Sequence, residues 1–223
     1  MPWLPPRPPL PPRPSARQAA LTVALVGLAN LPLLRAAWLH FGATETELDA
    51  PLPGDDLVEN ANLVATRAVT IAAPREEVWR WVVQIGADRG GFYSYDALEN
   101  LVGCRVRSAD QVEERWQHLE PGDRVHLHPS MWLTVAEATG GRALVLHGDG
   151  SQPDSPMAGF TWAFVLHRAQ RGGTRLVIRE RYGYRSGWDG LFVEPTAFVS
   201  FVMTEKMMRG IRSRAELAVR PGS

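Results

Sequence analysis

The side chains of this sequence that could do chemistry are few, and they do not assemble into a recognised catalytic set. His126 and His128 have the spacing that puts two imidazoles on one face of a strand, which suits two metal ligands. No nearby cysteine or third histidine completes the site, and protein zinc sites normally use at least three protein ligands. We therefore expect exposed strand histidines, with no metal and no cofactor. The sequence also contains no phosphate-cradling glycine loop and no nucleophile elbow, so no catalytic residue is assigned.

Glu205 is the most diagnostic carboxylate, because it falls on the apolar arc of the final predicted helix. An unpaired buried charge is costly, so a Glu205 that faces a cavity needs a partner or water. Arg179 or Arg181, on a predicted strand over 176–181, is the candidate partner. The alternative places Glu205 at the rim of the cavity in solvent, in keeping with the general rarity of buried glutamate.

Two tyrosines, Tyr93 and Tyr95, follow the pair Gly90-Gly91, which could form a mobile lip beside a ligand site. Asp96 comes next and is expected to cap a short helix over 95–101 rather than to act as an acid or base.

The elements that would position these groups are an aromatic strand and a long final helix. On the helix, about 195–217, one broad arc carries Phe198, Phe201, Val202, Met208, Ile211 and Ala215. On the strand, the period of two places on one face Phe160, Trp162, Phe164 and Leu166. These surfaces predict either a packed core or the walls of an apolar cavity. The predicted ligand-binding residues are Tyr93, Tyr95, Trp162, Phe164, Arg179, Phe198, Phe201, Val202 and Glu205.

A strand-to-helix junction lies upstream of these elements. Val69 and Ile71 alternate with small or polar residues, as a half-buried strand requires, and Pro74 suits the first turn of a helix. Helical spacing then relates Val78, Trp81, Val82 and Ile85, and Gly86 supplies a stop. Further strands over about 124–127, 132–136, 143–147, 159–166 and 175–184, separated by turn residues, predict an antiparallel meander.

These features resemble the SRPBCC superfamily of START-related, polyketide-cyclase-like proteins. The pattern Arg89 to Asp96 followed by Glu99-Asn100 is similar to a bacterial, membrane-anchored branch of that superfamily. The resemblance covers about Ala65 to Glu216. It implies an α+β helix-grip fold, in which a curved antiparallel sheet surrounds a long C-terminal helix and leaves a ligand cavity between them. Because the superfamily includes lipid carriers, hormone receptors and cyclases, the resemblance does not say what fills the cavity.

The N-terminal part of the chain differs in composition from this domain. The range 1–18 is rich in proline and arginine and is predicted to be disordered, and the apolar range 19–40 is predicted to be a membrane anchor. A buried or docking helix is the alternative, because the apolar run is short and is interrupted by Asn30 and Pro32. An excess of arginine before the apolar run predicts a single-pass membrane protein with a cytoplasmic N-terminus. The range 41–64 is predicted to be an acidic linker, 65–218 the helix-grip domain and 219–223 a disordered tail.

Composition limits the function further. A chain of 223 residues with 45% apolar residues can build a real core, and the single cysteine, Cys104, excludes an intramolecular disulfide. The nearly balanced charge gives no support to nucleic acid binding. We therefore expect a membrane-tethered domain that binds a small hydrophobic or lipid-like molecule between sheet and helix. The alternatives are a polyketide cyclase or dehydratase-like enzyme that uses the same cavity, and a structural or interaction domain whose cavity is filled; protein partners are not assigned.

Overall fold

The structure is a computed structural model that describes residues 32–101, 103–150 and 157–220, and Trp38–Ser223 belong to one compact unit. The described residues form a six-stranded antiparallel sheet in the order β1-β6-β5-β4-β3-β2. Its strands are β1 (Leu63–Ile71), β2 (Arg124–His128), β3 (Met131–Thr139), β4 (Ala143–Gly148), β5 (Met157–Arg168) and β6 (Thr174–Tyr184). Residues 32–39 are helical, and the further helices are α2 (Glu45–Asp49), α3 (Arg75–Val83), α4 (Asp96–Leu101) and α5 (Gly190–Ala218), with 3-10 turns η1 (Asp55–Val58), η2 (Glu114–Trp116), η3 (Gln170–Gly172) and η4 (Gly187–Asp189).

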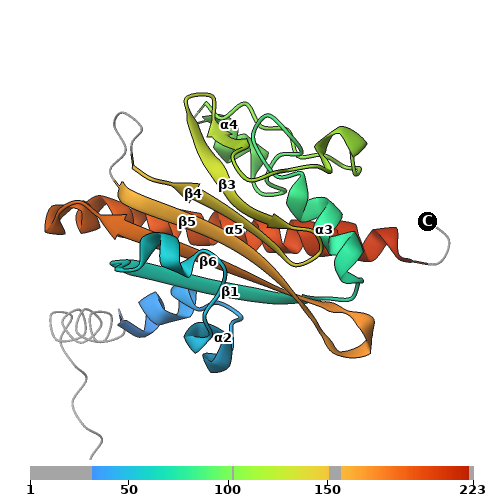
Figure 1. Ribbon diagram of the computed structural model, residues 1–223, viewed down its shortest axis with the longest axis horizontal. Coiled ribbons are helices and arrows are strands. Elements are labelled where there is room, and N and C mark those ends of the chain that lie inside the picture. The colour runs from blue at the N-terminus through green and yellow to red at the C-terminus, as the bar shows by residue number, and fades with distance from the viewer. Residues whose placement is uncertain (1–31, 102, 151–156, 221–223) are drawn as a thin grey trace, which may run out of the picture. The chain divides into compact units, whose positions relative to one another are not determined.

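The long helix α5 runs lengthwise across one face of the curved sheet (Figure 1). The predicted α+β helix-grip class is therefore confirmed. The helix begins at Gly190, earlier than the position near Pro195 that the sequence predicts. It starts there because Ser186 and Asp189 form a capping box in η4, directly before the first turn of α5.

The main core lies between the sheet and helices α3 and α5. The aromatic face predicted for β5 is confirmed, because its alternate residues all belong to this core: Phe160, Trp162, Phe164 and Leu166. From α5, the buried core residues are Val193, Ala197, Met207, Met208, Ile211 and Ala215. They fall on the side of α5 that the sheet covers, in two apolar groups, and between the groups Ser200 and Thr204 face the sheet.

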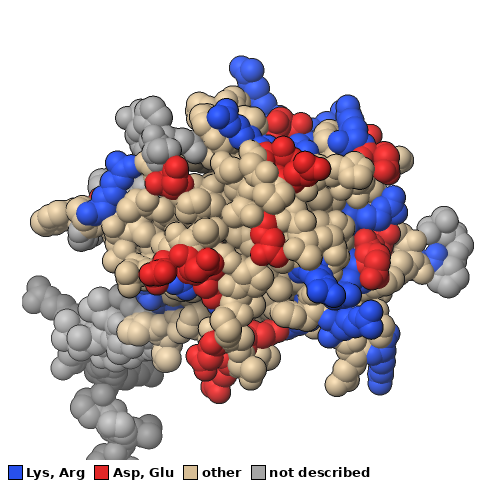
Figure 2. Space-filling view, viewed as in Figure 1, with Lys and Arg blue, Asp and Glu red and all other residues tan. Residues whose placement is uncertain are grey.

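A smaller apolar cluster lies on the outer face of the sheet, away from α5. It consists of Leu52, Ala68, Val145, Ala163, Val165 and Val177. The central strands are therefore buried on both faces. The range 41–64, predicted to be an acidic linker, contains α2 and η1 and lies over this outer face before it enters β1, and its acidic side chains gather there (Figure 2).

Three arginines on the outer face of β6 hold this segment in place. Arg175 Nε lies 2.7 Å from Glu47 Oε1, and Arg179 Nη1 lies 2.6 Å from Asp55 Oδ2. Arg179 is 3% exposed and also donates to the backbone carbonyls of residues 47, 48 and 50. Arg181 donates to the carbonyl of Val58 at 2.9 Å. Two acidic residues of this range, Glu47 and Asp55, are therefore partners of a strand that is more than one hundred residues away in sequence.

The predicted single-pass membrane location with a cytoplasmic N-terminus is corrected by the structure. Among residues 32–101, 103–150 and 157–220, no helix combines the length and the apolar composition that a bilayer crossing requires. Leu39, near the end of the predicted anchor 19–40, is 3% exposed and belongs to the main core, and the carbonyl of Trp38 accepts a hydrogen bond from Arg67. Trp38 and Leu39 therefore pack within the domain. Residues 1–31, which include the predicted segment 1–18 and most of the anchor, and residues 221–223 of the predicted tail lie outside the described residues.

Replacing Arg179 by methionine tests the anchoring of the segment 41–62. Methionine keeps part of the apolar stem but leaves Asp55 and several carbonyls without their donor, so we expect the free energy of unfolding to fall by about 3 kcal/mol. Urea denaturation measures it. Arg168→Met, at an exposed position at the end of β5, is the matched control. A loss in Arg179→Met no larger than in this control would contradict the anchoring role.

The pH dependence of stability tests the ion pair of Glu47. The hydrogen bond from Arg175, with help from Thr44, lowers the pKa of Glu47 from 4.5 to about 2. Because the folded pKa lies below the unfolded one, ionised Glu47 stabilises the fold above pH 4.5, and this contribution disappears as the pH falls toward 2. Glu47→Gln should therefore lower the free energy of unfolding by about 1 kcal/mol at neutral pH and leave it unchanged near pH 2. Glu45→Gln, on the exposed side of α2, is the control and should leave the dependence of stability on pH unchanged. The same pH dependence in Glu47→Gln and in the native chain would contradict the stabilising role of Glu47.

Candidate functional site

Two charged side chains lie inside the main core, beneath α5. Arg67 of β1 and Glu180 of β6 face the helix, and Arg67 Nη1 lies 3.0 Å from Glu180 Oε1. Their side chains are 0% and 1% exposed. In the sheet register Ala65 pairs with Glu180 and Arg67 pairs with Ile178, so the two charged residues are diagonal neighbours on adjacent strands.

Glu180 is surrounded by hydroxyl donors from α5 and from its own strand. Thr204 donates to Oε1 at 3.0 Å, and Ser200, one turn earlier on α5, donates to both carboxylate oxygens at 2.9 Å. Tyr182, two residues along β6, donates to Oε2 at 2.7 Å. Together with Arg67 these groups occupy the acceptor capacity of the carboxylate.

Arg67 is less completely satisfied than Glu180. Its Nε donates to the carbonyl of Trp38 at 3.1 Å, and its guanidinium carbon lies 5.7 Å from the centre of the Phe201 ring. Among the described residues, no group accepts a hydrogen bond from Nη2, and Nη1 approaches Glu180 without hydrogen-bond geometry. A fully buried guanidinium therefore retains donors that an oxygen acceptor could use.

Trp162 places a second buried donor in the same row of the sheet. It lies directly opposite Glu180 on β5, and its ring centre is 4.8 Å from that of Phe164 and 6.3 Å from that of Phe92. Trp162 is 8% exposed, and its Nε1 has no partner among the described residues. Three adjacent strands thus bring Arg67, Glu180 and Trp162 together under α5.

This arrangement is not what stability alone would favour. A buried ion pair costs desolvation that its attraction offsets only in part, and apolar residues of similar size often stabilise a core equally well or better. Convergent polar groups on an otherwise apolar and aromatic surface are instead the usual composition of a ligand site. We therefore take the concave face of the sheet under α5, defined by Arg67, Glu180, Trp162, Ser200 and Thr204, as the candidate site and name it the interior site.

The predicted aromatic residues divide between the interior and the surface. Phe164 is fully buried beside Trp162, and Phe201 is half-buried beside Arg67. Val202 is also half-buried, but Phe198 is 50% exposed, with its ring centre 5.8 Å from that of Trp38. The structure therefore brings Trp162, Phe164 and Phe201 to the interior site, whereas Phe198 lies at its outer margin.

The predicted partnership between Arg179 and Glu205 does not form. Arg179 lies on the outer face of the sheet, bound to Asp55, and Glu205 forms an ion pair with Arg209 one turn along α5. The sequence analysis missed Glu180, the residue next to Arg179. The period of two along the strand could have identified Glu180, because it places this carboxylate on the same face of β6 as Leu176, Ile178 and Tyr182.

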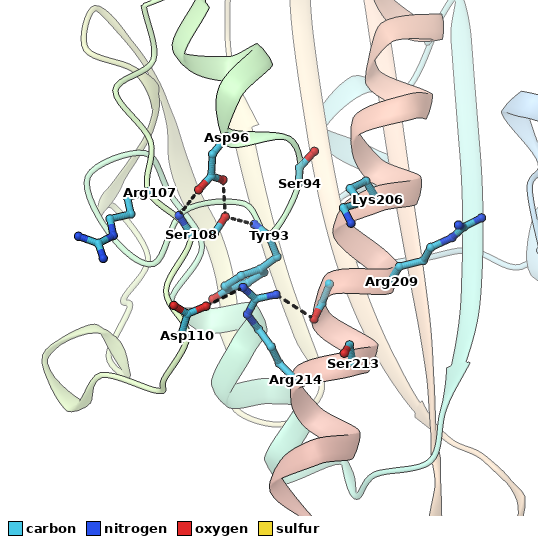
Figure 3. Close-up of a pocket in the computed structure, with 11 residues that line it drawn as sticks. Tyr93, Ser94, Asp96, Arg107, Ser108, Asp110, Lys206, Arg209, Ser213 and Arg214 are labelled. Atoms are coloured by element: carbon cyan, nitrogen blue, oxygen red, sulfur yellow. Dashed lines mark hydrogen bonds and ion pairs between the residues drawn. The ribbon is translucent and has the colours of Figure 1, made fainter.

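Tyr93 and Tyr95 lie away from the interior site, on a different side of α5. Tyr93 is 2% exposed, its hydroxyl donates to the carbonyl of Trp81 at 3.1 Å, and burial raises the pKa of this phenol. Tyr95 is 40% exposed beside Lys206. Asp96 begins α4, but its carboxylate accepts hydrogen bonds from the amide and hydroxyl of Ser108. These residues flank an open pocket of about 680 Å³ (Figure 3).

The two strand histidines are engaged separately. His126 Nδ1 lies 3.0 Å from Asp88 Oδ2, and His128 Nδ1 lies 2.9 Å from Ser130 Oγ. A register irregularity between them breaks the regular alternation that the sequence analysis assumed for β2. Within the described part of the chain, no cluster of three or more histidine, cysteine, aspartate or glutamate residues has the arrangement of a metal site.

Comparisons with known proteins show likeness in fold only. No family model matches the sequence, and no curated protein matches it. A protein from Nitrosospira multiformis and protein MLL2253 from Mesorhizobium loti each have a TM-score of 0.46 at 13% identity, over 71% of this chain and 100% of their own. The di-domain ARO/CYC StfQ from the steffimycin biosynthetic pathway has a TM-score of 0.39 at 11% identity, over 74% of this chain and 55% of its own. Similarity at this level carries no argument about a ligand, and the membrane-anchored branch of the SRPBCC superfamily gains no support from it.

A double-mutant cycle on Arg67 and Glu180 tests whether the two charges act as a pair. Glu180→Gln keeps an acceptor for the hydroxyls but leaves the Arg67 charge uncompensated, so we expect it to cost about 3–5 kcal/mol of folding free energy. Arg67→Met should cost a similar amount. The double variant should recover most of the loss, with a coupling energy of at least about 2 kcal/mol in urea denaturation. Additive losses would mean that the two charges are stabilised independently.

Proposed function

We propose that this domain binds a small, largely apolar molecule with one oxygen acceptor at the interior site, and that it does not transform this molecule. The observation that carries the proposal is the pair of buried donors, Arg67 Nη2 and Trp162 Nε1, on the aromatic face of the sheet. Leaving such donors unpaired costs free energy, and a ligand that supplies an acceptor recovers it.

The apolar body of the ligand is inferred from the residues around these donors. Phe92, Phe164 and Trp162 offer ring faces on the sheet side, and Met207 and Met208, each 2% exposed, lie on the covered face of α5. Methionine adapts its shape to irregular partners more readily than branched side chains do. This composition favours a rigid or aromatic hydrocarbon skeleton.

The polar group of the ligand is inferred to be neutral. Glu180 already compensates the charge of Arg67, so an additional carboxylate would leave one buried negative charge in excess. A ketone, ester or hydroxyl oxygen accepts a hydrogen bond without this cost. The proposed ligand class is therefore an apolar molecule with a carbonyl or hydroxyl group.

Binding is better supported than catalysis of the cyclase or dehydratase type, which needs a group that gives or takes a proton at the ligand. Glu180 has its acceptor capacity occupied by hydroxyl groups and Arg67. The phenol of Tyr182 donates to Glu180, and burial together with that neighbouring charge raises its pKa well above the ordinary value. Tyr182 therefore stays neutral and is not a base at physiological pH.

The proposal is tested with a pair of probes that differ in one oxygen. Benzophenone has two aromatic rings and a carbonyl, whereas diphenylmethane has the rings alone. We expect benzophenone to bind the full-length chain at least about tenfold more tightly, because one hydrogen bond from a charged donor contributes about 1.5–3 kcal/mol. Quenching of tryptophan fluorescence measures both affinities, and Trp162→Phe should reduce the preference for benzophenone.

Trp132→Phe is the matched control. Trp132 lies on β3, where its ring contacts Arg124 and His126 of β2, and it is not part of the interior site. Equal affinity for both probes would contradict the inferred acceptor. If neither probe binds, and native mass spectrometry of the full-length chain from its own host finds no retained molecule in repeated preparations, the proposal fails. The filled-cavity alternative of a structural domain would then be favoured.

A further inference from the structure

The open pocket beside Tyr93 is a second feature that could bind a molecule, and it is separate from the interior site. It lies between α5 and the segment 91–110 and has a volume of about 680 Å³. Figure 3 shows Lys206 and Arg214 extending from α5 toward the segment that carries Tyr93, whereas Arg107 and Arg209 extend outward on opposite sides. The interior site uses Ser200 and Thr204, which lie on the sheet-facing side of α5.

The pocket has an excess of positive charge. Its lining contains four cationic side chains, Arg107, Lys206, Arg209 and Arg214, against the two carboxylates of Asp96 and Asp110. The formal excess is two positive charges. A concave surface with such an excess concentrates anions from solution.

Two of these charged side chains, Asp96 and Arg214, are held by contacts within the structure. Both oxygens of Asp96 accept from Ser108, at 2.6 and 2.7 Å. Arg214 donates to the carbonyl of Ala109 at 2.9 Å, lies 3.4 Å from Asp110 and covers the ring of Tyr93 at 5.0 Å. Arg214 therefore forms a wall that joins α5 to the segment 91–110.

Lys206 and Arg107 differ from the other two cations of the lining, because Arg209 pairs with Glu205 and Arg214 with Asp110. Within the described part of the chain, neither forms an ion pair, and the ammonium of Lys206 has only a ring contact, 5.7 Å from the centre of Tyr95. Arg107 is exposed and projects from the segment 91–110. Both side chains are therefore available to an anion from solution.

The floor of the pocket is fixed by a close backbone contact. At Gly210 an added Cβ would lie 2.3 Å from the carbonyl oxygen of Tyr93, so only glycine allows α5 to approach this closely. Tyr93 has a φ of 57°, in the left-handed region, and its amide donates to Ser108 Oγ at 2.9 Å. The two walls therefore meet in a defined geometry rather than as independent surface elements.

We propose that this pocket binds a compact oxyanion, of which a phosphate monoester is the type that fits best. A phosphate monoester carries close to two negative charges near neutral pH, and Arg107 and Lys206, which no carboxylate pairs with in the described part of the chain, would supply two positive charges to meet them. A guanidinium can bind two phosphate oxygens in parallel, and an ammonium acts as a point charge on a flexible stem. Arg107 would supply the first kind of contact and Lys206 the second. The phosphate could belong to a soluble ester or to a lipid headgroup, since the recognised group is the same.

Isothermal titration of the full-length chain with inorganic phosphate at constant ionic strength tests this proposal. We expect saturable binding that weakens at least tenfold in Lys206→Gln and in Arg107→Gln. Neither side chain takes part in a hydrogen bond within the described structure, so both variants should keep the fold. Arg212→Gln is the matched control, because Arg212 lies on the same helix, pairs with Glu216 and does not line this pocket. Its affinity should stay within twofold of the native chain.

Vesicle sedimentation distinguishes the two sources of phosphate. If the site takes a lipid headgroup, the chain should sediment more with phosphatidylcholine vesicles that contain phosphatidic acid than with pure phosphatidylcholine, and both pocket variants should abolish the difference. If it takes a soluble ester, inorganic phosphate binds but the two kinds of vesicle sediment equal amounts. The proposal is overturned by the absence of saturable binding below about 10 mM phosphate together with equal sedimentation. An equal loss of affinity in Arg212→Gln would overturn it as well. The benzophenone preference should be unchanged in Lys206→Gln, so the two sites can fail separately.

Discussion

The alternation of side chains along β6 is the constraint on which the rest of the structure depends. Successive residues of a strand point to opposite faces, so Arg179 and Glu180 cannot serve the same side of the sheet. Arg175, Arg179 and Arg181 face outward and hold α2 and η1, whereas Glu180 faces α5. A slip of one residue in strand pairing would turn these arginines into the core and remove the partners of the acidic segment. The register of β6 is therefore strongly specified, and the interior site is fixed by the interactions that attach the N-terminal segment.

The position of Glu180 in the middle of the sheet explains how a charge can be buried there. β1 and β6 are neighbours, as are β6 and β5, so Arg67 can reach Glu180 diagonally from one side while Trp162 stands opposite it on the other. α5 contributes two hydroxyls from above, because Ser200 and Thr204 are one turn apart and face the same way. The carboxylate is thus compensated by three elements, β1 through Arg67, β6 through Tyr182 and α5 through its two hydroxyls. Among the described residues Arg67 keeps donors without an acceptor, and this imbalance between the two charges is what supports the proposed binding role.

The sequence predicts the elements of this fold better than it predicts their partners. Local periodicity is enough for the aromatic face of β5, the helix after Pro74 and the meander of strands, because each pattern lies within about ten residues. The choice between Arg179 and Glu180 is different, since it depends on which face of β6 meets α5. The range 41–64 has the composition of a solvated linker, and local pattern does not reveal that Glu47 and Asp55 pair with arginines that follow much later in the chain. Periodicity could have identified Glu180, but the absence of a partner for Arg67 Nη2 is visible only in three dimensions.

The helical period of α5 places the interior site and the open pocket on different sides of the helix. Both sites also use residues of this one helix. Thr204 and Lys206 are two residues apart, which places their side chains about 200° apart around the helix axis. A ligand at one site therefore does not touch the residues of the other. Both sites nevertheless depend on where α5 lies, and Gly210 fixes that position against the backbone of Tyr93, with no room for a side chain. A movement of α5 away from the sheet must therefore carry the segment 91–110 with it or break this contact. Because Arg214 bonds to the same segment, moving the two together preserves more interactions and would keep the shape of the pocket while the interior opens.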